Sequence, residues 1–115
     1  MSVLTRRVAI VTDGTGVASA TVRAGGLKLL AIEVELGTLS TPDIAITDEP
    51  STRELLSVAG LAADAHYTCG VQLQDTDGTN LTGAFGVPIV TGRIEIAVTG
   101  GGAAKSGNVT LVMER

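Results

Sequence analysis

The sequence predicts an all-β protein, an antiparallel β-sandwich of jelly-roll-like or immunoglobulin-like build with about eight short strands. Three observations predict this fold class. Polar and apolar residues alternate with period two between the turns, as half-buried strands require. Fifteen glycines and three prolines punctuate the chain, giving turns roughly every 8 to 12 residues. No helical pattern alternates with the strands, as a parallel sheet would require.

The clearest alternation lies at the end of the chain, in residues 91–99 and 108–115. Between them, residues 100–107 contain four glycines, which allow backbone angles closed to other residues. We therefore predict two strands paired as an antiparallel hairpin, with a tip longer than the usual two to five residues or so. The side chains predicted to face inward are Ile94, Ile96, Val98, Val109, Leu111 and Met113.

Six earlier segments also read as strands, and they are 6–12, 17–22, 27–36, 43–48, 54–58 and 66–74. Residues 59–65 are too short for a stable helix, so we expect them to cross from one sheet to the other. Residues 75–80 form a turn, and the poorly patterned 81–90 forms a connection.

Segment 27–36 changes its pattern partway along. Leu30, Ile32, Val34 and Leu36 hold one face, while the other face begins with apolar residues and ends with Glu33 and Glu35. The first half is therefore predicted to be covered on both sides and the second half on one. A helix is the rival interpretation, but no helical apolar stripe is present.

Composition limits the class of protein. A chain of 115 residues fits one domain, residues 1–115. A net charge of -4 argues against nucleic acid as a partner. One Tyr, one Phe and no Trp argue against recognition by aromatic stacking. No apolar run approaches a signal sequence or a membrane span, and the single cysteine forms no internal disulfide, so we expect folding in a reducing cytoplasm.

Paired carboxylates are the first candidate chemistry. Glu33 and Glu35 on one strand face would lie about 6.5 to 7 Å apart, close to the separation in inverting glycosidases. Such acidic alternation is also the common state of a solvated sheet face, which is the favoured interpretation. His66 and Cys69 have opposite strand parity, so a catalytic pair or zinc site is not expected from them.

Two loops carry weaker signals. Asp75, Asp77 and Asn80 resemble the start of a calcium loop, but its order and its bidentate Glu are missing, and an Asp-Gly turn explains them. The glycines at 100–102 lack the following helix of a phosphate cradle. We therefore predict no enzyme activity and no catalytic, cofactor-binding or metal-binding residues.

Several stretches resemble small β-rich proteins from the structural modules of tailed bacteriophages. They are 27–36, 41–48, 55–67, 73–83 and the two terminal strands. The resemblance covers most of the chain beyond about residue 25 and carries no catalytic residues. It implies a virion component made in the host cytoplasm, with the major capsid protein or other virion proteins as partners.

The resemblance and the physical pattern together give an expected function. We expect a homo-oligomeric capsid decoration protein, without a cofactor and without nucleic-acid or membrane partners, that contacts its neighbours through residues 1–7 and a flexible arm at 100–107. Arg6 and Arg7 either meet an acidic partner surface or form a solvated strand end. The alternatives are a neck or tail protein of the virion, or a sugar-binding adhesion module, which glycan binding that survives mutation of the two aromatic residues, Tyr67 and Phe85, would support.

Overall fold

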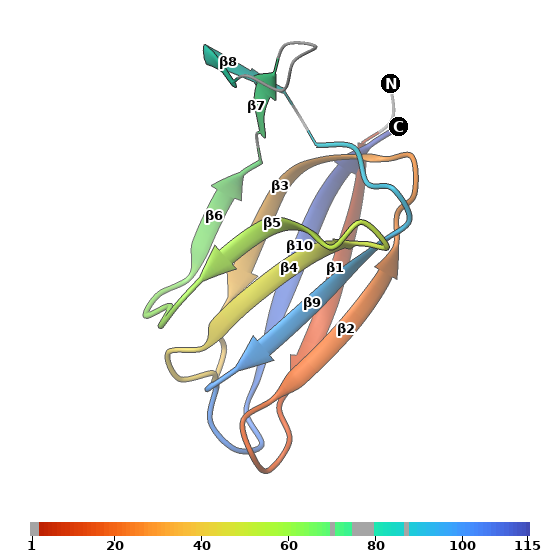
Figure 1. Ribbon diagram of the computed structural model, residues 1–115. Coiled ribbons are helices and arrows are strands. Elements are labelled where there is room, and N and C mark those ends of the chain that lie inside the picture. Colours follow the sequence, from red (N-terminus) through yellow and green to blue (C-terminus); the bar gives the residue numbers. More distant parts are fainter. Residues whose placement is uncertain (1–2, 70, 75–79, 87) are drawn as a thin grey trace.

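A computed structural model describes residues 3–69 and 88–115 with their side chains, and 71–74 and 80–86 by their backbone. The described residues form ten strands (Figure 1). They are β1 (Val3–Val11), β2 (Ala18–Arg23), β3 (Lys28–Glu35), β4 (Asp43–Glu49), β5 (Arg53–Val58), β6 (Ala65–Thr68), β7 (Val71–Gln74), β8 (Asn80–Gly86), β9 (Arg93–Thr99) and β10 (Ser106–Glu114).

Eight of these strands form two facing antiparallel sheets of four. Sheet A has the order β1-β10-β3-β6, and sheet B has the order β2-β9-β4-β5. Strands β7 and β8 pair only with each other. The predicted all-β antiparallel sandwich is confirmed.

The core lies between the two sheets and is aliphatic. The inward positions of alternating strands are fully buried, because period-two alternation directs every second side chain to the same face. Ile94, Ile96, Val98, Val109, Leu111 and Met113 are all buried, as predicted. Ile10, Ile32, Ile44 and Ile46 meet them from the remaining strands.

The predicted hairpin of residues 91–115 is wrong. Strand β9 pairs with β2 and β4 in sheet B, whereas β10 pairs with β1 and β3 in sheet A. The segment between them crosses the sandwich, helped by positive φ angles at Gly100 (65°) and Gly102 (88°). Alternation reveals that a segment is a strand but does not reveal its neighbour. Among the described strands, only β4–β5 and β7–β8 pair with their neighbours in sequence.

The change of pattern in β3 has a structural cause, which is a β-bulge. Ala31 pairs with Val112 and Leu29 pairs with Met113, so Leu30 is the extra residue. The bulge brings Leu29, which is fully buried, to the core side with Met113. Glu33 and Glu35 remain on the exposed outer face, as predicted.

The chain between residues 59 and 92 is partly as predicted. Residues 59–64 do cross from sheet B to sheet A. The single strand predicted at 66–74 is instead two strands, because β6 ends at Thr68 and β7 pairs with β8. The predicted connection at 81–90 contains most of β8, which its sequence pattern did not reveal. The turn predicted at 75–80 lies, except for Asn80, outside the described residues.

Strands β7 and β8, which we call the arm, extend the molecule. In Figure 1 they stand beyond one end of the sandwich, at the end where both termini lie. Neither strand contacts another strand of the described part of the chain. The radius of gyration is 14.8 Å, above the value of about 13.3 Å expected for a compact chain of this length.

Candidate functional site

The paired carboxylates predicted from the sequence are each engaged with a different partner. Glu35 Oε2 accepts a hydrogen bond from Arg7 Nη2 at 3.2 Å, and Glu33 Oε1 lies 3.0 Å from His66 Nδ1. All four side chains are about half exposed or more on the outer face of sheet A. They lie on a solvated sheet face, which is the favoured interpretation, with an ion pair between Arg7 and Glu35 and a hydrogen-bond contact between His66 and Glu33.

His66 and Cys69 are separated by the fold, as their opposite parity predicts. His66 is exposed beside Glu33, whereas Cys69 is half-buried against the core. Burial raises the pKa of the Cys69 thiol and therefore disfavours its reactive thiolate form. No group of potential metal ligands occurs among the described residues, and the calcium-like stretch 75–79 lies outside them.

The glycine-rich loop at 100–107 is hydrogen-bonded to the sandwich, so the predicted free hairpin tip is wrong, whereas the expected contact role stays a prediction. Thr12 Oγ1 donates to Gly102 O at 2.6 Å and accepts from Lys105 N at 2.8 Å. Gly101 is buried, and its N–H donates to Gly16 O at 3.2 Å. The loop closes one end of the sandwich because it must carry the chain from sheet B to sheet A.

At the opposite end, a buried carboxylate fastens the base of the arm. Asp48 on β4 is fully buried, and its oxygens accept from Thr91 N at 3.0 and 3.2 Å and from Thr91 Oγ1 at 2.9 Å. Arg53 Nη2 donates both to Asp48 Oδ2 at 3.0 Å and to the Ile89 carbonyl at 2.7 Å. We call Asp48, Arg53 and Thr91 the latch.

Sequence reasoning missed the latch although a signal was present. Asp48 has the same parity as Ile44 and Ile46, so the alternation that places those two in the core also buries the carboxylate. A buried ionised group needs partners. Thr91 is 43 residues away in the chain, and only the fold brings the two together.

Backbone hydrogen bonds hold the base of the arm on the other side. Leu29 N donates to Pro88 O at 2.9 Å, and Val90 N donates to Leu27 O at 2.8 Å. Cys69 N, just before β7, donates to Leu30 O at 2.9 Å. The arm therefore starts and ends on β3 and is held firmly at its base.

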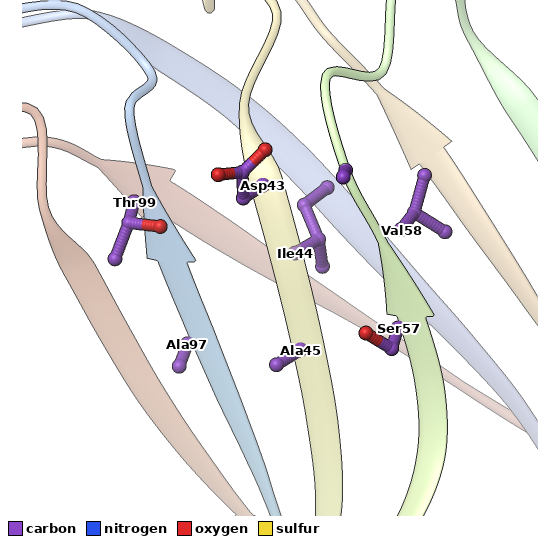
Figure 2. Close-up of a pocket in the computed structure, with 8 residues that line it drawn as sticks. Asp43, Ile44, Ala45, Ser57, Val58, Ala97 and Thr99 are labelled. Atoms are coloured by element: carbon purple, nitrogen blue, oxygen red, sulfur yellow. The ribbon is translucent and has the colours of Figure 1, made fainter.

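A shallow hollow of about 300 Å³ lies on the outer face of sheet B (Figure 2). Ala97, Ala45 and Ser57 are cross-strand partners, and their small side chains form its floor. Asp43 and Thr99 stand at one end, and Asp43 Oδ1 accepts from Gly60 N at 2.7 Å. Asp43 is the one ionisable residue among those lining the hollow. A general acid and a general base acting together would need a second ionisable side chain in the lining.

We compared the chain with family models, curated proteins and solved structures. None of these three comparisons finds a match. The function must therefore be argued from the molecule itself.

The two contact segments expected from the sequence have different outcomes. Residues 3–7 form the start of edge strand β1, where Val3 is 59% exposed and Arg7 binds Glu35 of its own chain. The loop at 100–107 is occupied in closing the sandwich. The arm, which sequence reasoning did not find, is the element that extends away from the fold. Among the described residues, none forms a helix long and apolar enough to cross a membrane.

Proposed function

We propose that this chain is a structural protein of the bacteriophage virion, a decoration protein that binds the outside of the head and stabilises it. The resemblance of residues 27–36, 41–48, 55–67 and 73–83 to phage structural proteins supports the phage context. The arm supports the structural role and is the observation that carries the proposal.

A two-stranded hairpin is marginally stable by itself in water. The arm packs on no other described strand, yet a fully buried carboxylate holds its base. A latch of this kind gives the arm a defined direction, which is useful if the strands meet a surface outside their own domain. In a shell, many copies of such a weak contact act together and bind strongly.

The structure bears differently on the two alternative functions, a neck or tail protein and a sugar-binding module. A neck or tail protein also needs an element that reaches a neighbour, so the arm favours it equally. A sugar-binding module needs an aromatic platform, but Tyr67 is half-buried against the core, and the side chain of Phe85 lies outside the described residues. The structure thus offers no observation that favours sugar binding.

The proposal is tested by mass spectrometry of purified, disassembled particles from cells that produce the protein. We expect the chain in the particles at a copy number comparable with that of the major capsid protein. A copy number far below it would move the protein to the neck or tail. Absence from the particles would end the virion proposal.

A binding experiment tests the part played by the arm. Capsids that lack the protein are mixed with the purified chain and with a variant in which residues 70–87 are replaced by a short glycine-serine linker. We expect the variant to keep the cooperative thermal unfolding of the two-sheet sandwich and to lose capsid binding. The control is Gly14→Ala, an exposed site with no atom within 4 Å of the added Cβ. Equal binding by all three proteins would contradict the role of the arm.

A further inference from the structure

The outer face of sheet A carries an apolar cluster at the end where the arm begins. Its members are Val3, Leu30, Ile89 and Val112, which we call the arm-end patch. Val3 is 59% exposed and Ile89 is 54% exposed. Leu30 and Val112 are half-buried and lie outside the core cluster.

Strand register brings these residues together. One cross-strand row at this end runs through Ile89, Lys28, Glu114 and Val3. Paired residues in neighbouring strands share a face, so Ile89 and Val3 flank the Lys28–Glu114 ion pair. The bulge in β3 places Leu30 beside Ala31, opposite Val112.

A contiguous exposed patch differs from single exposed apolar residues, which are normal on any protein. The alternation of residues 27–36 predicts that the first half of this strand is covered on both faces. Within one chain, the core covers one face, while the outer face retains the arm-end patch. The patch is therefore a candidate contact surface for a second molecule.

The charges on this face favour a second copy of the same chain as the partner. Two ion pairs, Arg7–Glu35 and Lys28–Glu114, and the contact between His66 and Glu33 place basic groups beside acidic ones on this face. A partner of one charge sign would oppose half of these groups. A copy related by a two-fold axis presents the same mixture and can match both signs.

The area of the outer face of sheet A can be compared with the area that a stable dimer interface buries. Four strands spaced by about 4.8 Å give a face roughly 19 Å wide, and the nine residues of β10, rising by about 3.3 Å each, give a greatest length of roughly 30 Å. The projected area is at most about 570 Å², because β6 has only four residues. A stable interface buries about 800 Å² on each partner. The sheet face falls short of this area, and the arm at its end supplies further surface.

We infer that two copies associate through the outer face of sheet A, with the arm-end patch at the contact and the arm of each copy lying against the other. This dimer stands or falls separately from the virion role. A protein absent from particles can still dimerise in this way, and a virion protein can be monomeric.

Sedimentation velocity over a concentration series tests the inference with the full chain. We expect a dimer for the wild type. The Val3→Lys/Ile89→Lys variant should weaken dimerisation by about a hundredfold, roughly tenfold for each apolar side chain replaced by a charged one. Both sites are more than half exposed on one chain, so the variant should keep the wild-type far-ultraviolet circular dichroism spectrum. The matched control is Val17→Lys, at an exposed valine outside the patch (42% exposed), and it should remain dimeric.

A second measurement uses the wild type alone and does not depend on how a variant folds. The chain has two lysines: Lys28 lies in the proposed contact, and Lys105 is exposed in the loop between β9 and β10. Acetylation of Lys28 should slow as the concentration rises, while that of Lys105 stays constant. A monomer at every concentration would overturn the inference. So would a dimer that is insensitive to Val3→Lys/Ile89→Lys and leaves Lys28 as reactive as in the monomer.

Discussion

Replacing Asp48 by alanine tests whether the latch stabilises the whole fold. The carboxylate is fully buried on β4 and joins this strand to Thr91 and Arg53. In Asp48→Ala, the Thr91 amide and hydroxyl lose their acceptor, and Arg53 loses its anion. We expect the free energy of unfolding to fall and the base of the arm to loosen.

The magnitude follows from the contacts. Loss of the hydrogen bonds from Thr91 to a charged acceptor costs about 2 kcal/mol. Arg53 is 40% exposed, so solvent screens its ion pair, and we assign it about 1 kcal/mol. The total of about 3 kcal/mol is a large share of the roughly 5 to 15 kcal/mol of an ordinary domain. At about 4 °C per kcal/mol, the melting temperature should fall by about 12 °C.

Urea unfolding followed by far-ultraviolet circular dichroism is the suitable assay, because the chain has no tryptophan to report by fluorescence. Asp48→Asn keeps an acceptor for Thr91 and loses the charge, so it should cost about half as much. Asp43→Ala changes the same residue type at the exposed end of the same strand and should cost no more than about 1 kcal/mol. If Asp48→Ala costs less than about 1 kcal/mol, the latch does not stabilise the fold and our reasoning fails.

Two further predictions concern the end of the sandwich opposite the arm. Gly107→Ala would place a Cβ 2.6 Å from Glu35 O, so urea unfolding should show that the free energy of unfolding falls by about 1 to 3 kcal/mol. The control Gly14→Ala should leave this free energy nearly unchanged, because nothing lies within 4 Å of its added Cβ. Equal values for the two variants would show that the loop is not packed. Hydrogen bonds from Thr15 and Val17 hold the pKa of Asp13 below its ordinary value of 3.8. The ionised Asp13 carboxylate therefore stabilises the fold above pH 3.8, and this stabilisation is lost as the pH falls through the lowered pKa. Carboxyl NMR titration should place the Asp13 midpoint below 3.8, and a midpoint at or above that value would contradict the hydrogen bonds.

Much of the fold could be predicted because alternation is a local property. Residues 91–99 and 108–115 were predicted as strands, and the structure has strands at 93–99 and 106–114. Their inward side chains were assigned correctly, since successive residues of a strand point to opposite faces whatever lies beside them. The exposure of Glu33 and Glu35 on the outer face follows from the same rule. The β-sandwich class and the aliphatic core were therefore determined by the sequence alone.

Pairing was decided by tertiary structure. The terminal strands alternate in the same way whether they pair with each other or lie in opposite sheets, so their adjacency in sequence misled the prediction of a hairpin. For the same reason, the glycine-rich loop was assigned to a free tip, although its backbone binds Thr12, some 90 residues earlier. The arm was missed because β8 is defined by its hydrogen bonds to β7, while its own sequence alternates poorly.

The latch and the arm-end patch each combine a property that the sequence determines with one that only the tertiary structure decides. From the sequence alone it follows that Asp48 shares the inward parity of Ile44 and Ile46 and that the first half of segment 27–36 needs cover on both faces. The tertiary structure decides which residue donates hydrogen bonds to the buried carboxylate and which side chains lie beside Leu30 on the outer face. Both depend on contacts between segments 40 to 80 or more residues apart. Such contacts are set by the pairing and register of the strands. The sequence of a strand indicates which of its side chains lie on each face, but it does not indicate which strand lies beside it.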